Sequence, residues 1–323
     1  MGDGLELGDW LGIRRLLEGG DAWLSHRLGE PFANLPLINR LFGHARISAR
    51  GLLIASLAVV VFMVVPPLIE RLLRRQRCVA VNFRGESIPQ SFGVAILVCA
   101  ALMLGLIAWM YPVQAQDRLT WLFCIVAFGL LGVADDLFGD KKVKGLRGHL
   151  NAFLRGHRIT TGLIKAVGGL LVAFCIGLRL HGGDVPTVLL ATCVIALSAN
   201  AMNLLDLRPG RACGAFCVSA VVLLAAGFLH DAPSPPSLLY VWLPALITWP
   251  RDARARVMLG DAGSNLLGAS LGLAICVYAA PVAQIAILAA LAILHVVAER
   301  VSITKVIEGN RFLRAIDRLT GIR

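Results

Sequence analysis

The stretch GLLIASLAVVVFMVVPPLI, residues 51–69, contains no charged side chain and is long enough to cross the apolar core of a bilayer as a helix. The stretch SFGVAILVCAALMLGLIAWM, residues 91–110, has the same character. Of the 323 residues, 57% are hydrophobic and 16% are charged, whereas a water-soluble domain has roughly 25% charged residues. The sequence therefore predicts a polytopic membrane protein.

Apolar runs of this kind recur along the chain, and we expect about nine membrane-spanning helices in an all-α fold. Helices are expected because each backbone polar group inside a bilayer must find its partner within the segment. The expected spans are residues 51–70, 92–111, 119–136, 162–180, 186–204, 212–230, 237–249, 262–279 and 281–298. Residues 51–323 form the predicted transmembrane domain. Residues 1–50 form an N-terminal extension, either amphipathic helices in the membrane interface or a plain extramembrane segment.

Lysine and arginine are distributed unevenly between the two sides of these spans. The segments that follow the first, third, fifth, seventh and ninth spans hold 22 of them, whereas the opposite loops hold only Arg118 and Arg179. Because basic loops stay in the cytoplasm, we expect the first set and the C-terminus to be cytoplasmic and the N-terminus to lie outside. The net charge of +11 is thus explained by loops at a bacterial-type plasma membrane, and we expect no nucleic-acid partner.

Three polar clusters interrupt this pattern at the ends of apolar runs. A carboxylate deep in a bilayer costs about 2.5–3.5 kcal/mol, so such groups are candidates for function. The clusters are GVADDLFGD (132–140), NAMNLLD (200–206) and MLGDAGSN (258–265), which carry Asp135, Asp136, Asn200, Asn203, Asp206 and Asp261. The loop charges place all three on the cytoplasmic side, which predicts a single site.

The positions of the carboxylates indicate that this site attracts cations. Asp135, Asp136 and Asp206 stand at C-terminal helix ends, where the helix dipole disfavours negative charge, and two adjacent carboxylates repel each other. A divalent cation or the lysines of the following loop, Lys141, Lys142 and Lys144, would offset this charge. Oxygen ligands of this kind suit Mg²⁺ or Mn²⁺.

Asp261 differs because it stands at a predicted helix start between Gly260 and Gly263. The N–H groups of such a start are suited to phosphate, so Gly260 is a candidate for substrate binding. The sequence also allows Asp261 to be only an N-cap residue.

Structural roles are open for the other residues too. Asp135 and Asp136 could be interfacial carboxylates paired with loop lysines, and Asn200 and Asn203 could join neighbouring helices by hydrogen bonds. The agreement of three clusters on one side favours a functional site. The repeated Arg-Gly-His triplets at His149 and His157 are interpreted as part of a solvated basic loop rather than as a diphosphate contact.

Together, the clusters resemble the polyprenyl-phosphate N-acetylhexosamine-1-phosphate transferases. That family has an Asp-Asp pair ending one span, then Asn-Ala-x-Asn-x-x-Asp-Gly-x-Asp-Gly, then Met-Gly-Asp-x-Gly-Ser opening another. Here ADD (134–136), NAMNLLD (200–206) and MLGDAGS (258–264) occur in the same order. The segments RGESIPQSFG (84–93) and ERVSITKVIEG (299–309) are similar to the family's first cytoplasmic loop and to its segment after the ninth span.

The resemblance implies an Mg²⁺-dependent enzyme that transfers a sugar-1-phosphate from a UDP-sugar to a polyprenyl phosphate in the membrane and releases UMP. It implies that Asp261 and Asn203 hold the metal and that Asp135 and Asp136 activate or position the lipid phosphate. The residues assigned to substrate binding are Asn200, Asp206, Lys165, Lys144, Arg147 and Gly260. The partners are therefore the lipid and the nucleotide-sugar donor, and the sequence also allows a homodimer.

The chain departs from the family pattern at the donor side. Where the family has Asp-Gly-x-Asp-Gly, this sequence has Asp206-Leu207-Arg208-Pro209-Gly210, and residues 308–323 lack the family's His-rich motif. The sequence leaves two alternatives open. One is a catalytically silent relative that binds polyprenyl phosphate or scaffolds envelope assembly. The other is a transporter, which is less well supported because the polar groups gather on one side rather than at the midplane.

Overall fold

The computed structural model describes residues 49–111, 115–139, 160–229 and 237–321. The chain divides into two units, residues 1–63 and 64–323, and the helices described below belong to the second unit except for residues 49–63, the first part of the first helix. The candidate residues Lys144 and Arg147, with Lys141, Lys142, His149 and His157, lie outside the described residues. The same holds for residues 1–48 of the predicted N-terminal extension.

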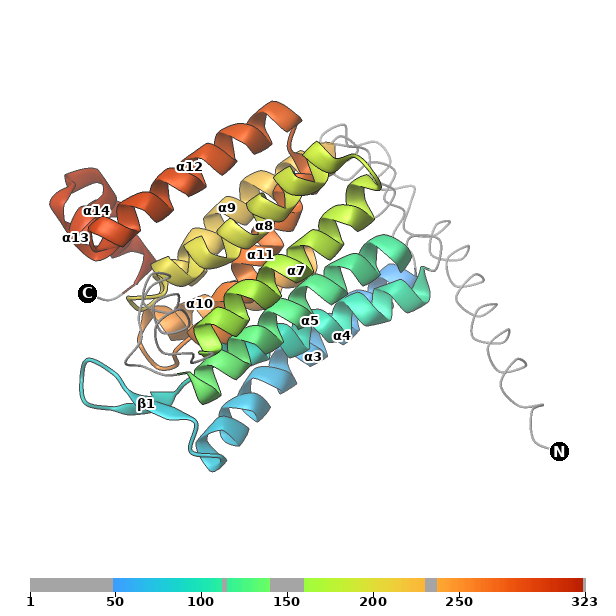
Figure 1. Ribbon diagram of the computed structural model, residues 1–323. Helices are drawn as coiled ribbons and strands as arrows, with labels where there is room; N and C mark the ends of the chain where they lie inside the picture. The colour runs from blue at the N-terminus through green and yellow to red at the C-terminus, as the bar shows by residue number, and fades with distance from the viewer. Residues whose placement is uncertain (1–48, 112–114, 140–159, 230–236, 322–323) are drawn as a thin grey trace, which may run out of the picture. The chain divides into compact units, whose positions relative to one another are not determined.

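Each of the nine expected spans coincides with a helix (Figure 1). These helices are α3 (Ala49–Arg75), α4 (Gly93–Met110), α5 (Ala115–Phe138), α7 (Thr161–His181), α8 (Val185–Leu205), α9 (Arg211–Leu229), α10 (Leu239–Ala253), α11 (Gly260–Tyr278) and α12 (Pro281–Arg300). Two shorter helices follow, α13 (Ile303–Gly309) and α14 (Arg311–Thr320).

Seven helices in the described part of the chain are long and apolar enough to cross a membrane, namely α3, α4, α5, α7, α8, α11 and α12. The two others are shorter or less regular. The part of α9 whose side chains the structure describes ends at Ala226, and α10 has 15 residues with Pro244 and Pro250 inside it. The fold is thus that of a polytopic membrane protein, whereas nine crossings and the sides of the two termini remain predictions.

The all-α expectation is wrong for one short segment. Strands β1 (Val79–Val81) and β2 (Ser87–Pro89) pair antiparallel, with Ala80 opposite Ile88. Gly85 turns the chain between them at φ +80°, a conformation that few other residues adopt. The pairing of the two strands provides hydrogen-bond partners for the backbone N–H and C=O groups of this loop. The strands are too short to show an alternating pattern in the sequence.

Helix α11 is the buried centre of the bundle. Its residues from Ala262 to Cys276 are all buried, and it packs against α4, α5, α8 and α9. Glycines allow the closest approaches, because a Cβ on Gly93 would lie 2.1 Å from the Gly263 Cα, and one on Gly132 would lie 2.2 Å from the Asp261 carbonyl oxygen. The start of α4, the end of α5 and the start of α11 therefore meet at one end of the bundle.

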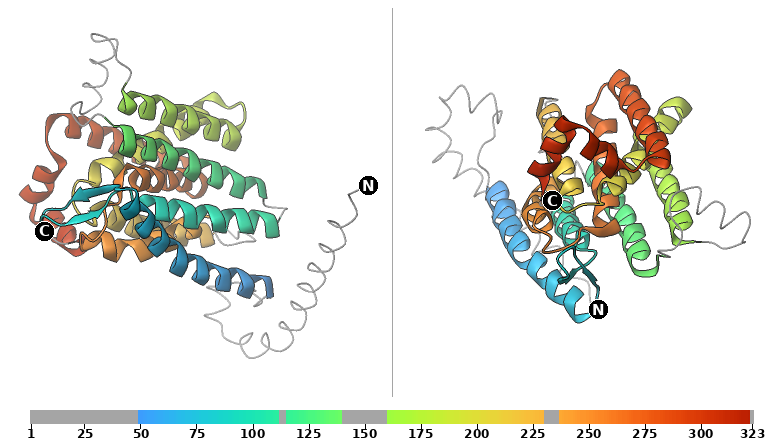
Figure 2. Two further views of the ribbon diagram at one scale, coloured as in Figure 1. Left: turned by 90° about the horizontal axis from the view of Figure 1, so that it is seen from below. Right: turned by 90° about the vertical axis from the view of Figure 1, so that its left-hand side faces the viewer.

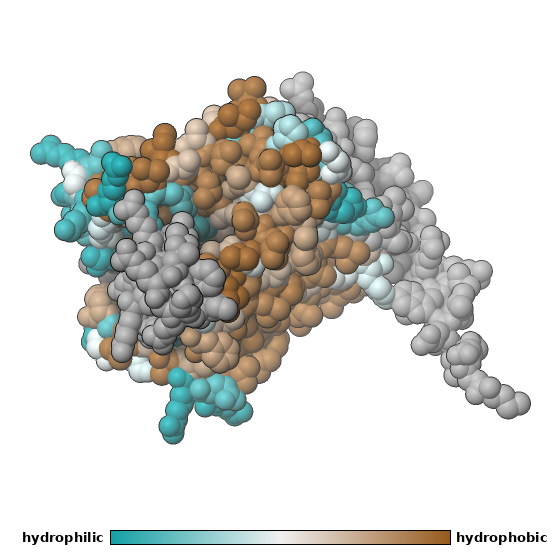
Figure 3. All heavy atoms as spheres, in the orientation of Figure 1, coloured by the Kyte–Doolittle hydropathy of each residue, from teal (hydrophilic) through white to brown (hydrophobic). Residues whose placement is uncertain are grey.

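The outer surface of the bundle suits a lipid environment. Hydrophobic side chains cover the middle of the helices in the view of Figure 3, and hydrophilic ones gather toward both ends, including the end that carries β1–β2 and α13–α14. Figure 2 shows from other directions that β1–β2 and α13–α14 lie at the same end of the bundle. In α12, Gln284 is the one buried side chain among the described residues, as expected of a helix that faces lipid.

Candidate active site

Four helix ends bring the predicted polar residues together. The C-terminal ends of α5 and α8 and the N-terminal ends of α7 and α11 lie at the same end of the bundle. Both α7 and α11 pack against α5 and α8. Consecutive helices of the bundle run antiparallel, so the end of one helix and the start of the next lie at the same end of the bundle. Residues separated by more than a hundred positions in the sequence thus become neighbours.

A single ammonium group joins the members of this cluster. Lys165 Nζ lies 2.6 Å from Asp135 Oδ2 and also forms an ion pair with Asp261 Oδ2. In the orientation that satisfies its amide, Asn203 donates to Asp261 Oδ1 (2.9 Å) and accepts from Lys165 Nζ (3.1 Å). The three charged side chains retain 16–27% of their exposure, so a ligand can reach them. We call Asp135, Lys165, Asn203 and Asp261 the ionic cluster.

The second aspartate of the pair has other partners. Asp136 accepts hydrogen bonds from the backbone N–H groups of Asp261 (3.0 Å) and Ala262 (3.1 Å), and Ser91 Oγ donates to it over 2.7 Å. A carboxylate at this place satisfies two of the N–H groups that a helix start leaves unpaired and complements its dipole. Asp136 therefore caps α11, and Asp261 does not cap its own helix, since Leu259 holds the N-cap position without a side-chain bond.

Asp206, which follows the last residue of α8, meets the same helix start. Its carboxylate accepts from the N–H of Gly260, whose φ of +73° turns the chain into α11. Burial raises the pKa of Asp206 well above its ordinary value, and Asp252, Asp261 and Asp136 raise it further. The N–H groups of Gly260, Asp261 and Ala262 thus serve Asp206 and Asp136. Phosphate binding at Gly260 stays a prediction.

The two predicted metal ligands, Asp261 and Asn203, are neighbours, and Lys165 Nζ bonds to both of them. Asp261 and Asn203 touch each other, and the carboxyl groups of Asp135 and Asp261 lie within hydrogen-bonding reach. Among the described residues, no group of three or more His, Cys, Asp and Glu side chains forms a complete metal cage. Mg²⁺ suits such a set, because it usually takes one or two carboxylates and completes its shell with water and substrate phosphates.

The remaining candidates are placed less centrally. Asn200 stands one turn before Asn203 on α8 and is exposed. Asn203 also joins α8 to α7 and α11, so it makes the interhelical bonds that the sequence allowed. Sequence reasoning missed Ser91 as a site residue, although the segment RGESIPQSFG that contains it was already similar to a family loop.

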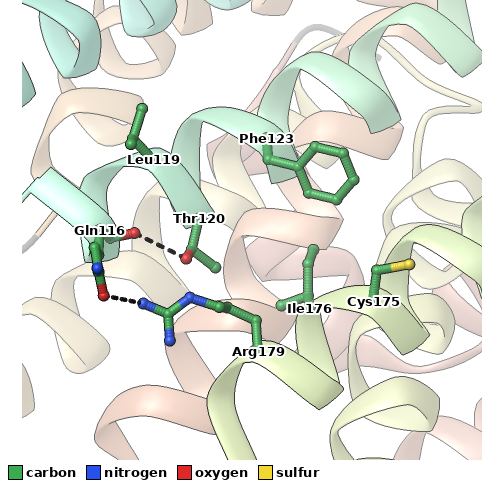
Figure 4. Close-up of a pocket in the computed structure, with 7 residues that line it drawn as sticks. All are labelled: Gln116, Leu119, Thr120, Phe123, Cys175, Ile176 and Arg179. Carbon is green, nitrogen blue, oxygen red and sulfur yellow. Dashed lines mark hydrogen bonds between the residues drawn. The ribbon is translucent and has the colours of Figure 1, made fainter.

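A surface pocket lies away from the ionic cluster. It has a volume of about 540 Å³ between α5 and α7, and Phe123, Cys175 and Ile176 form its apolar side (Figure 4). Arg179 donates to Gln116 (2.7 Å) at its polar edge. Gln116 lies in the first turn of α5 and Arg179 in the last turn of α7, so the pocket is at the opposite end of these two helices from the ionic cluster.

The profile of the family described as glycosyl transferase family 4 matches residues 118–279. The chain belongs to glycosyl transferase family 4. The match contains the whole ionic cluster together with Asp136 and Asp206, whereas Ser91 and α14 lie outside it. This confirms the family suggested by the three motifs.

Two curated members of similar sequence are both named phospho-N-acetylmuramoyl-pentapeptide-transferase. They come from Chlamydia abortus and Chlamydia caviae, and each is 27% identical to this family 4 chain. The matches cover 55% of the chain and 56% of each relative. The chain thus spans little more than half the length of these relatives, which fits a divergent member.

Proposed function

We propose that this protein transfers a sugar-1-phosphate from a nucleotide sugar to a polyprenyl phosphate at the end of the bundle where the ionic cluster lies. The observation that carries the proposal is the ammonium of Lys165 between the carboxylates of Asp135 and Asp261, beside the Asn203 amide. This arrangement lies within the family match, and the names of the two relatives support transfer of a phosphorylated sugar.

The reaction needs positive charge and an oriented nucleophile. An oxygen of the lipid phosphate attacks the sugar-bearing phosphorus of the donor, and the bond from that phosphorus to the oxygen of the nucleoside monophosphate breaks. The ammonium of Lys165 stabilises the negative charge on the transferred group, and Asp135 orients the lipid phosphate and accepts its proton if it carries one. The leaving UMP retains the electron pair of the broken bond.

Asp261 and Asn203 would hold Mg²⁺ or Mn²⁺, which would polarise the diphosphate of the donor. Asp136 contributes indirectly, because its hydrogen bonds to the start of α11 hold the backbone that carries Asp261. Asn200 and Asp206 are proposed to contact the nucleotide-sugar donor, as the resemblance to the family implies. Gly260 acts by its turn and by giving its N–H to Asp206.

The donor is proposed to be a UDP-sugar, and the setting to be envelope-glycopolymer synthesis at the cytoplasmic face of a bacterial-type plasma membrane. The basic segments between the spans support that face. Segment 207–209 differs from the family pattern, so the sugar and base specificity should differ from that of the two relatives. The alternative is a silent relative that binds the lipid phosphate at the same cluster without transfer.

The test uses the purified chain in nanodiscs with undecaprenyl phosphate, Mg²⁺ and a panel of UDP- and other nucleotide sugars, scored for release of the nucleoside monophosphate. Release that is abolished in Asp135→Asn and Asp261→Asn, and by chelation of the metal, supports the transferase. Binding of undecaprenyl phosphate without release from any donor would establish the silent relative instead.

A further inference from the structure

Helix α14 (Arg311–Thr320) is packed with its polar side inward. Asp317 and Thr320 are buried, whereas Phe312, Ile316 and Leu319 are exposed by 71%, 44% and 83%. A helix on the surface of a water-soluble bundle shows the opposite pattern, with its apolar stripe against the core. The exposed stripe of α14 therefore faces something other than water.

The inward side is held firmly. Arg211 Nε donates to Asp317 Oδ1 over 2.7 Å, and a second guanidinium nitrogen of Arg211 donates to Asp317 Oδ2 over 3.2 Å. This two-point ion pair is almost completely buried. Trp249 also donates from its indole nitrogen to the Thr320 carbonyl (2.8 Å). These contacts fix the rotation of α14 about its own axis, so the outward direction of the stripe is set by the fold.

The other two sides of α14 have distinct characters. Phe312, Ile316 and Leu319 follow a spacing of four and three residues, which makes one apolar stripe along a helix. The three arginines of the helix follow a similar spacing on a second side and are all exposed, namely Arg311, Arg314 and Arg318. The three sides are about 120° apart at 3.6 residues per turn, so the basic side adjoins the apolar stripe.

The preceding chain leads from a lipid-facing surface to this stripe. Ile293 and Val296 of α12 are exposed by 65% and 57%, and α12 is long and apolar enough to cross a membrane. Val301 and Val306, between α12 and α14, are also exposed. Exposed apolar side chains thus continue along the chain into α14, and α14 lies at the end of the bundle that α12 reaches (Figure 1).

We propose that α14 is an interfacial helix that lies on an anionic bilayer surface. Its apolar stripe enters the boundary between headgroups and acyl chains, and its three arginines bind lipid phosphates. Charge complementarity selects this occupant, because α14 exposes three cations and buries its one carboxylate. Through Arg211, the membrane contact is linked to segment 206–211 beside the ionic cluster. The proposal stands on the packing of α14 and does not depend on the transferase activity.

The test places spin labels on the full chain in nanodiscs of phosphatidylglycerol and phosphatidylcholine. The accessible native cysteines Cys78, Cys175 and Cys193 are replaced by serine, and the five buried ones remain. Labels are attached to Phe312→Cys and Leu319→Cys, one for each variant. Ile293→Cys on α12 is the lipid control, and Arg84→Cys in the exposed turn between β1 and β2 is the aqueous control.

Accessibility to oxygen, which dissolves in lipid, and to an aqueous nickel complex is then measured. The proposal predicts that labels at 312 and 319 resemble the lipid control. It also predicts a shift toward the aqueous control in phosphatidylcholine alone and in the triple variant Arg311→Gln, Arg314→Gln, Arg318→Gln. The thermal midpoint of each variant shows that the fold is retained.

Three outcomes would overturn the proposal. Labels that match the aqueous control in anionic nanodiscs would show that α14 lies in water. Labels shielded from both reagents would show that protein, such as a second copy of the chain, covers the stripe. Lipid-like labels that are indifferent to headgroup charge and to the arginine variants would refute the anionic surface as the partner.

Discussion

Asp135 and Asp136 are adjacent in the chain, yet Asp135 pairs with Lys165 of α7 whereas Asp136 caps α11. We predict that their amide variants fail in different ways. Asp135→Asn should reduce nucleoside monophosphate release by about 100-fold or more, since it removes a charged group at the reacting centre. Asp136→Asn should destabilise the fold by about 0.5–2 kcal/mol, the usual value of a helix cap, and reduce activity less.

Turnover and thermal unfolding of both variants, measured in the same detergent, check this difference. Equal losses of activity at unchanged stability would contradict the separation of roles and would place Asp136 in contact with substrate.

Lys165 is predicted to be needed for both stability and activity. Replacing it by Met leaves the carboxylates of Asp135 and Asp261 facing each other without the ammonium between them. The upper bound of the cost is about 3–5 kcal/mol, the value for a fully buried pair that loses one partner. Lys165→Arg keeps the charge and should recover most of the thermal midpoint but little turnover, because the longer, planar group cannot take the same position. A stable and active Lys165→Met protein would refute the role of the cluster.

Ser91 combines a hydrogen bond with an unfavourable backbone conformation. Its hydroxyl donates to Asp136, and its φ is +60°, where glycine is favoured over residues with a Cβ. Ser91→Ala should cost about 1 kcal/mol through the lost bond. Ser91→Gly loses the same bond but relieves the backbone, so it should be more stable than Ser91→Ala. Thermal midpoints in the reverse order would argue against this view of the loop.

Gly132 is predicted to be intolerant of even one methyl group. An added Cβ would lie 2.2 Å from the carbonyl oxygen of Asp261, so α5 and α11 would have to separate at the site. Gly132→Ala should therefore lower both the yield of folded protein and its activity. Gly105→Ala is the matched control within α4, because nothing lies within 4 Å of the added atom and alanine favours the helix. Similar behaviour of the two variants would show that the close approach is not required.

Hydrophobic run length and loop charge were sufficient to predict the helices of this bundle and the grouping of its polar residues. Run length predicts where a helix must form in lipid, and the positions of helix ends then determine which motifs meet. For this reason Asp135, Asn203 and Asp261 could be assigned to one end before any contact was known, whereas Lys165 was suggested only by the resemblance to the family.

The different roles of neighbouring residues within one motif could not be predicted in the same way. Asp135 and Asp136 have the same residue type and the same sequence surroundings, and only the rotation of α5 against α11 decides which of them meets the N–H groups. The strands β1 and β2 have three residues each, too few for a pattern. The partner of Arg211 is 106 residues away on α14, so no local signal reveals it.

Asp206 leads to a prediction on pH. Its pKa in the folded protein is well above the ordinary value of about 3.9, because burial and the neighbouring Asp252 disfavour its charge. Above about pH 4, the unfolded chain therefore releases this proton while the folded chain retains it. Linkage then requires that this residue lowers stability as pH rises through the window between the two pKa values. Asp206→Asn is uncharged throughout and lacks this contribution.

We therefore expect the thermal midpoint of Asp206→Asn, relative to the unaltered chain, to increase as the pH is raised from about 4 to the folded pKa of Asp206. The measurement is made in detergent with EDTA, so that bound metal does not contribute. Asp117→Asn removes an exposed carboxylate from the first turn of α5 and controls for the change in net charge. A difference between Asp206→Asn and the unaltered chain that stays constant across this range would mean that Asp206 holds its proton no more tightly in the fold than in the unfolded chain.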